Sequence, residues 1–294
     1  MRSTTLVLAL ALGTLGASAD APKPIPEVAS DAQATEALVA FEEAFKAKGL
    51  KGDVKLAAQE QALWQLSQVQ HATVIDRLAK MSRSTTVEHR TLAVTYLGEQ
   101  RALPGLAGPE IVTAMQRNAT DPVLIMAGLQ ALGDVGYRGV VDVLKGFFTH
   151  KDEFVVKAAL LAVGDLKEMR LLDEILKLIK DLKLDKAVKW EGGEVHYDTG
   201  AAGDSDQKMA EKMYADKYGK NAGKGRGAGR VQRDMGPIVF ETLKRLTGEQ
   251  FDSGEAVRLW SEANKASIDT QKKTLAEEEK AQKAAGAAGA QPPR

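Results

Sequence analysis

The amino-acid sequence predicts an all-α protein in which pairs of helices are stacked in a row. Aromatic residues make up only 5% of the 294 residues, while alanine and leucine are abundant, and this mixture favours closely packed helices over β-sheets. Apolar residues recur at helical spacings of three and four residues and do not alternate as in strands. One pattern occurs twice, at 129–148 and 160–179: an apolar helical stretch, Gly-Asp, a polar turn and a second apolar helical stretch.

The first 19 residues have the features of a cleavable signal peptide. Arg2 is basic, residues 6–12 form an apolar run, and Ala17-Ser18-Ala19 fits the small-x-small pattern that signal peptidase recognises. A membrane anchor is the alternative, but the apolar run is far shorter than the roughly 20 residues of a membrane-spanning helix. The sequence contains no cysteine, which excludes a lipid-anchored lipoprotein and any disulfide. We therefore expect a periplasmic or secreted protein without a transmembrane span in its mature chain.

A proline-rich leader, residues 20–30, is expected to be extended and to precede the first helix. Ser30 is a suitable N-cap, and the helix should run to about Lys48 and end at Gly49. Its apolar residues recur at helical spacing on one side, which predicts that this side is buried.

We assign residues 31–184 to helical repeats. Within this range a unit of two helices occurs four times, and the first unit begins near residue 53. The first helix of each unit ends at a small residue, and a polar residue comes next. The small residues are Ser67, Gly98, Gly133 and Gly164. The intervals between them are 31, 35 and 31 residues. The second helices begin with paired apolar residues near Val74, Ile111, Val140 and Leu171. Asp121 and Asp152 are placed as N-caps.

The paired helices, the Gly-Asp turn and the capping aspartates resemble HEAT-like repeats, in the short form of about thirty residues that occurs in bacterial arrays. Full HEAT units are longer, roughly 40–47 residues, and Ser67 replaces the glycine in the first unit. The resemblance implies a right-handed α–α superhelix, an armadillo-type solenoid whose second helices line the concave side. A single pair cannot bury its apolar stripe, so stacking of the pairs would create the core.

The sequence changes character after residue 184. Residues 185–234 are expected to be an insertion with a small β-hairpin (188–200), a short helix and a Gly-rich basic loop (219–233). A terminal repeat helix and cap should follow at 235–268, with Pro237 in the first helical turn and Trp260 covering the open end, as in the closing segment of secreted HEAT-like proteins that this stretch resembles. Residues 269–294 are expected to be a charged, solvated helix and a disordered tail.

The basic loop is a candidate for binding an anion or a partner, through Lys220, Lys224, Arg226 and Arg230. Amides of a Gly-rich loop are able to cradle phosphate. However, Gly219 and Gly223 are one residue too close for a phosphate-binding P-loop, and no Ser or Thr follows Lys224. A flexible, solvated insertion is the alternative that this composition favours.

Other polar residues suggest no cofactor or metal. Asp198, Asp204 and Asp206 alternate with glycine, as in calcium loops, but the pattern is incomplete, and Asp204 and Asp206 also suit a helix N-terminus. The histidines lack the spacing of metal ligands; they are His71, His89, His150 and His196. No catalytic residue is predicted, because no nucleophile motif is present. Trp64 and Tyr96 are expected to pack in the core.

The function expected from these features is that of a non-enzymatic, protein-binding scaffold in the bacterial cell envelope. Solenoids offer extended surfaces for protein or peptide partners. Basic and acidic residues balance at 40 each, so no overall charge attracts nucleic acid or membranes. Two alternatives stay open: a binder of polyanions or envelope polymers that uses the loop at 219–233, and an accessory subunit of an enzyme.

Overall fold

The computed structural model describes residues 24–46, 51–184 and 228–289. These residues form twelve α-helices and one short 3-10 helix, and none of them is in a β-strand. The all-α class is therefore confirmed, whereas the predicted hairpin lies outside the described residues. The helices are α1 (Asp31–Phe45), α2 (Gly52–Ser67), α3 (Ala72–Met81), α4 (Val87–Leu97), α5 (Pro104–Arg117), α6 (Pro122–Val135), α7 (Val141–Phe147), α8 (Glu153–Asp165), η1 (Met169–Leu171), α9 (Leu172–Asp181), α11 (Ala228–Thr247), α12 (Gly254–Ala263) and α13 (Lys265–Gly289).

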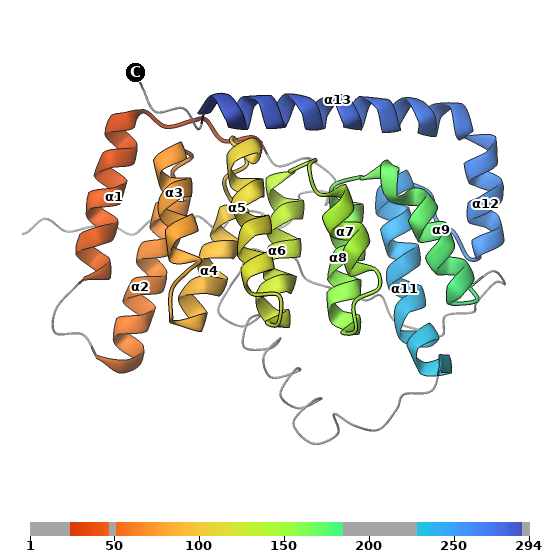
Figure 1. The fold of residues 1–294 in the computed structure, drawn as a ribbon, viewed down its shortest axis with the longest axis horizontal. Coiled ribbons are helices and arrows are strands. Elements are labelled where there is room, and N and C mark those ends of the chain that lie inside the picture. Colours follow the sequence, from red (N-terminus) through yellow and green to blue (C-terminus); the bar gives the residue numbers. More distant parts are fainter. Residues whose placement is uncertain (1–23, 47–50, 185–227, 290–294) are drawn as a thin grey trace, which may run out of the picture.

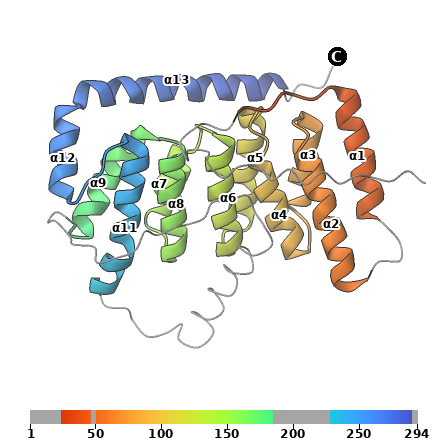
Figure 2. The ribbon, with the colours of Figure 1, turned by 180° about the vertical axis from the view of Figure 1, so that it is seen from behind.

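The helices stand side by side in a row with two layers (Figures 1 and 2). The first layer contains α2, α4, α6, α8 and α11, and each of these helices packs against the next. The second layer contains α1, α3, α5, α7 and α9. One continuous core of buried apolar side chains runs from Phe41 in α1 to Leu275 in α13. The second-layer helices α3 and α9 are strongly amphipathic, and each turns its apolar face toward this core.

The small residues that mark the repeat lie where first-layer helices approach one another. A Cβ on Gly98 would lie 2.8 Å from the backbone Cα of Ala131 in α6, and a Cβ on Gly164 would lie 3.0 Å from the Cβ of Arg245 in α11. Glycine at these two positions therefore permits closer packing of neighbouring helices than alanine does. Ser67 is fully buried, and its carbonyl accepts a hydrogen bond from the Gln100 side chain at 2.8 Å.

The predicted helix caps are present. The carboxylate of Asp121 accepts hydrogen bonds from the backbone N–H groups of Val123 and Leu124, and that of Asp152 accepts one from Phe154. Ser30 and Gln33 form a capping box at the start of α1. Residues 24–30 have no regular structure, and the Ala29 N–H donates to the Gln70 carbonyl at 2.9 Å. The described start of the chain is thereby attached to the turn between α2 and α3.

Helix α11 begins earlier than the sequence indicates. It starts at Ala228, so that Pro237 lies inside the helix and not in its first turn, and Arg230 belongs to a helix and not to a loop. The helix packs along α8 and buries Val239 and Leu243 completely. This burial outweighs the one backbone hydrogen bond that a proline removes from a helix interior.

Helix α12 lies at the end of the row and packs against α9 (Figure 1). Trp260 is partly buried there, and its ring meets that of Phe251 edge-on, with 5.8 Å between the centroids. The side chain therefore lies at the end of the row of helices.

Helix α13 differs most from expectation. Residues 265–289 form one 25-residue helix that turns back along the row, at the edge where each first helix turns into its second (Figure 1). We call this edge the turn edge. Helix α13 contacts η1 and α5, and its inward residues Ile268, Leu275 and Gly286 are buried. The predicted disordered tail is thus helical up to Gly289, because this face finds a surface on which to pack.

Candidate functional site

The second layer contains an open groove between α5 and α7. Helix α5 packs against α3 but has almost no contact with α7, which has only seven residues. Two adjoining hollows of about 220 and 240 Å³ lie in this gap. Their apolar lining comes from α5, α6 and α7: Val112, Met115, Ile125, Val143 and Phe147. The groove is on the layer of second helices, which the sequence analysis expects on the concave side.

His150 contributes to both hollows. Its Nδ1 accepts a hydrogen bond from the Asp152 backbone N–H at 3.1 Å. In the neutral ring this bond places the proton on Nε2, which is then a donor. The Asp152 carboxylate also borders the groove, but it accepts from the Phe154 N–H at 2.9 Å as the N-cap of α8.

Two residues of opposite charge line the first hollow, the exposed Lys151 and the neighbouring Asp152. In the described ranges, no three His, Asp or Glu side chains converge to hold a metal ion. The groove is thus apolar at its base and carries one charge of each sign at its rim.

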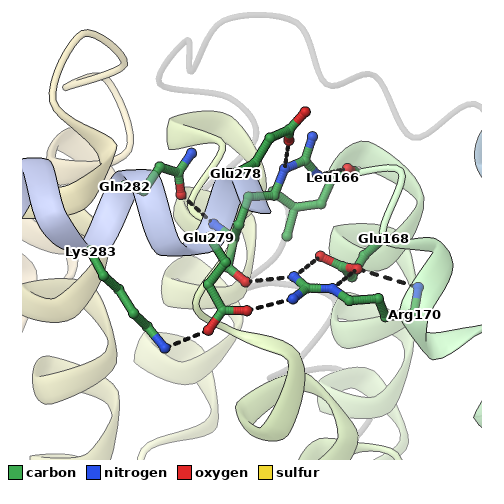
Figure 3. Close-up of polar contacts among 8 residues, drawn as sticks. Leu166, Glu168, Arg170, Glu278, Glu279, Gln282 and Lys283 are labelled. Carbon is green, nitrogen blue, oxygen red and sulfur yellow. Dashed lines mark hydrogen bonds and ion pairs between the residues drawn. The ribbon is translucent and has the colours of Figure 1, made fainter. Parts of the chain in front are cut away.

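On the turn edge, α13 is held by polar contacts (Figure 3). The Gln282 side chain accepts from the Arg138 N–H at 2.7 Å and donates to the Gly136 carbonyl at 2.9 Å. The guanidinium of Arg138 pairs with Glu278 at 3.0 Å and donates to the Leu166 carbonyl. These contacts connect α13 to the turn between α6 and α7.

Arg170 makes the second set of contacts. Its guanidinium donates twice to Glu168, at 2.7 Å each, to Glu279, and to the Arg138 carbonyl at 2.9 Å (Figure 3). The side chain of Glu168 has no solvent exposure, so Arg170 is its compensating charge. We call Arg138, Glu168, Arg170, Glu278, Glu279 and Gln282 the clasp.

The clasp is ionic at neutral pH. Hydrogen bonds to Glu168 and Glu279 raise the pKa of Arg170 despite its burial. Burial favours the neutral form of Glu279, but hydrogen bonds from Lys283 and Arg170 outweigh it and hold the pKa of this carboxyl below its ordinary value. Both groups therefore keep their charges over the neutral pH range.

The predicted binding residues are mostly not placed. Lys220, Lys224 and Arg226 lie outside the described residues, as do Asp198, Asp204, Asp206 and His196. Arg230 is placed only as a residue of the first turn of α11. The structure thus describes neither the basic loop nor the candidate calcium ligands.

The other histidines are separate from one another. His71 is the N-cap of α3, with Nδ1 accepting from the Thr73 N–H and Nε2 lying 3.1 Å from Asp31. His89 is buried against Phe45, and His150 borders the groove.

Trp64 contradicts the expectation of core packing, because 46% of it is exposed on α2. Tyr96 on the neighbouring α4 is half-buried, and this burial raises the pKa of its hydroxyl to about 12. Trp64 stands next to the buried Leu63 and Leu66, but its own position on the helix turns it outward.

Sequence reasoning missed the groove and the clasp. A signal for the clasp was available: Arg138 and Arg170 are 32 residues apart, close to the repeat interval, and each follows a Gly-Asp turn. Their partners in α13 gave no signal, since Glu278 and Glu279 belong to a run of three glutamates that resembles a solvated surface.

The chain matches no protein-family model, no curated protein and no solved structure. Within residues 24–46, 51–184 and 228–289, no helix combines the length and the apolar composition of a membrane span.

Proposed function

We propose that this protein is a non-enzymatic scaffold of the bacterial cell envelope that binds a protein or peptide partner. In this proposal the helix pairs are HEAT-like units in a right-handed α–α solenoid. The regular packing of each first-layer helix on the next supports this architecture, and so do glycines that permit close approach at a repeat interval of 31 to 35 residues. Such arrays act through extended surfaces of one helix layer.

One observation carries the proposal: the second layer has an apolar groove that no other described element covers. Val112, Val143 and Phe147 are only partly buried there. Contact with a partner would cover these side chains and remove their apolar surface from water. The N-terminal sequence, with its signal-peptide pattern, supports a location in the envelope or outside the cell.

The chemistry of the groove supports binding over catalysis. Asp152 is engaged in capping α8, and His150 accepts a backbone hydrogen bond. The alternative function through the loop at 219–233 depends on residues that the structure does not describe.

The test is co-purification from cell-envelope extract with three forms of the tagged protein. Ala119 is exposed and lines both hollows, so Ala119→Trp fills the groove without burying new bulk in the core. Ala57→Trp places the same side chain on the exposed surface of α2 as a matched control. We expect one protein to be retained by the unaltered chain and by Ala57→Trp, and to be lost with Ala119→Trp.

Two results would count against the proposal. A partner retained equally by all three forms would exclude the groove as its site. A partner lost only when Lys220, Lys224, Arg226 and Arg230 are all changed to alanine would transfer the function to the basic loop.

A further inference from the structure

Helix α13 is joined to α12 by a single residue, Asn264, at a sharp corner (Figure 1). The N–H of Asn264 donates to the Trp260 carbonyl and its own carbonyl accepts from the Ile268 N–H, both at 3.0 Å. These bonds have the spacing of an α-helix, so the helical pattern reaches the corner from both sides. Residues 255–285 contain neither proline nor glycine, and the sequence around the corner therefore favours a continuous helix.

Straightening the corner would add backbone hydrogen bonds. A helix that begins anew leaves its first N–H groups without helical partners. At the start of α13 these are the N–H groups of residues 265–267, and within the described chain none of them donates to a carbonyl of α12. In a continuous helix they would donate to residues 261–263, four positions earlier. The corner is therefore maintained by the docking of α13 on the row.

The contacts that dock α13 on the row involve partners outside α12. Lys272 pairs with Asp173 of α9 at 2.8 Å, and Glu278 pairs with Arg138 at 3.0 Å. The rest of the clasp joins α13 to the turns at 136–138 and 166–170 (Figure 3). A second copy of the chain presents all of these partners, so α13 of one copy is able to make the same contacts on the turn edge of the other.

The turn edge is selective for the sequence of α13. Arg138 and Arg170 bind two adjacent carboxylates, and the amide of Gln282 follows one turn later. Near the end of the helix, a Cβ on Gly286 would overlap the Gly105 carbonyl, so this position requires glycine. An occupant must offer carboxylates, an amide and a glycine at the spacing i, i+1, i+4 and i+8. A second copy of this chain offers that combination by identity.

The exposed side of the two helices also suits a symmetric pair. Leu259 is 62% exposed, and Ala263, Ala266 and Thr270 are exposed as well. In a continuous helix these four residues follow i, i+4, i+7 and i+11 and share one face. Two such helices crossing at the former corner would cover this face, and the small side chains would permit close approach.

We propose that α13 is exchanged between two copies of the chain: the corner at Asn264 straightens, and each α13 docks on the turn edge of the other copy. Exchange of an identical element is a low-cost route to a dimer, because the docking contacts of the monomer are kept. In the monomer α13 is tethered beside its own site, at an effective concentration of roughly millimolar. The dimer should therefore form at high protein concentration. This proposal is independent of the groove.

Charge reversal on opposite sides of the contact tests the exchange. The row variant combines Arg138→Glu with Asp173→Lys, and the helix variant combines Glu278→Arg with Lys272→Asp. Within either chain, like charges then face each other across the turn edge. A mixture restores both pairings between chains: the unaltered helix of one variant meets the unaltered row of the other, and the two reversed surfaces also match.

The mass of the full chain in solution is measured by size-exclusion chromatography with light scattering. We expect each variant alone to be mostly monomeric, and an equimolar mixture at the same total concentration to contain at least tenfold more dimer. The matched control carries all four reversals in one chain, which restores the pairs within that chain. It should have the same dimer fraction as the unaltered protein, and circular dichroism should show equal helix content in all forms.

A change at the corner is a second test that leaves the docking contacts intact. Asn264→Ala removes the side-chain amide that donates to the Trp260 carbonyl at 2.9 Å and introduces a better helix former. It should raise the dimer fraction of the otherwise unaltered chain at least threefold. A mixture of the charge variants that is no more dimeric than either alone would overturn the exchange. An unchanged dimer fraction in Asn264→Ala would overturn the straightened corner.

Discussion

His89 is a buried base without a partner for one of its nitrogens. It is 6% exposed, its ring lies 5.1 Å from that of Phe45, and its Nε2 is buried without a hydrogen bond. Burial lowers the pKa of His89 below its ordinary value of 6.5; Glu88 opposes this effect and Lys55 adds to it. The folded protein therefore holds His89 neutral in a range where the unfolded chain is already protonated.

The lowered pKa of His89 predicts that the folded protein loses stability at acidic pH. As the pH falls from about 6.5 towards the lower pKa of the folded state, unfolding takes up a proton, and the free energy of unfolding decreases. Urea denaturation at pH 7.5 and 5.5 should show a larger loss for the unaltered protein than for His89→Phe, which cannot be protonated. Equal losses in the two forms would contradict this role of His89.

Gly98 and Gly133 both mark the repeat, but we expect their replacement by alanine to have opposite effects on stability. In Gly98→Ala the new Cβ meets the Ala131 backbone at 2.8 Å, so α4 and α6 must separate, at a cost of about 1–3 kcal/mol. In Gly133→Ala the nearest atom, the Cβ of Asp165, is at an ordinary 3.4 Å, and alanine is the better helix former by ~0.5–1 kcal/mol. We expect thermal denaturation to show a lower Tm for Gly98→Ala and an equal or higher Tm for Gly133→Ala. A loss in both would mean that neither interface tolerates a methyl group.

Arg170 stabilises mainly by compensating Glu168. Removing one member of a buried ion pair costs about 3–5 kcal/mol, because the other charge stays buried and unpaired, whereas replacing both by apolar residues is often neutral. Arg170→Met should therefore destabilise strongly, and the double variant Glu168→Met with Arg170→Met should recover most of the loss in urea denaturation. Additive losses would show that the two side chains act independently.

At the scale of elements, α13 has two halves that are held differently. Its first half buries Ile268 and Leu275, while its second half depends on the clasp and on the close approach of Gly286 to Gly105. Substituting Glu278, Glu279 and Gln282 by alanine should raise amide hydrogen exchange at 276–289 at least tenfold and leave 265–275 protected. The matched control changes the outward residues Lys273, Glu277 and Lys280 to alanine. Exchange that rises along the whole helix would contradict this division.

The packing of α13 could not be predicted from the sequence, whereas that of the first-layer helices could. The first-layer helices are recognisable because a continuous apolar face coincides with a small residue at a fixed interval. The inner face of α13 instead presents Glu279 and Gln282, whose partners are an arginine and backbone groups more than a hundred residues away. No local pattern encodes such a contact, so the helix resembles a solvated one.

Little of the candidate site was predictable from the sequence. The apolar pairs at Ile111 and Val140 indicate where α5 and α7 lie, but not which layer binds a partner. The groove itself requires α7 to end at Phe147 and α5 and α7 to stand apart, and this depends on how α5 and α7 pack on α6 and α8. The outward position of Trp64 likewise depends on which side of α2 faces α4.

At the scale of the whole molecule, α13 couples units that are not neighbours. Repeat arrays unfold according to nearest-neighbour contacts, but α13 contacts both α5 and η1.

The test uses the full chain with Trp190 and Trp260 changed to Phe, so that Trp64 is the only source of tryptophan fluorescence. The urea midpoints from this fluorescence and from far-UV circular dichroism should coincide. Removal of residues 265–294 should separate them, whereas removal of 290–294 alone should not. Coincident midpoints after the larger deletion would show that the row is cooperative without α13.

The length of α13 also has a genetic consequence. A helix of 25 residues is about 37 Å long, and its anchor points contact α5, the α6–α7 turn and η1 in fixed positions. Duplicating one helix pair would lengthen the row by ~8–10 Å, and each anchor residue would then face the wrong turn. Each gain or loss of a helix pair would need a matching change of about 5–7 residues in α13, so that the number of helix pairs is inherited together with the helix that spans them.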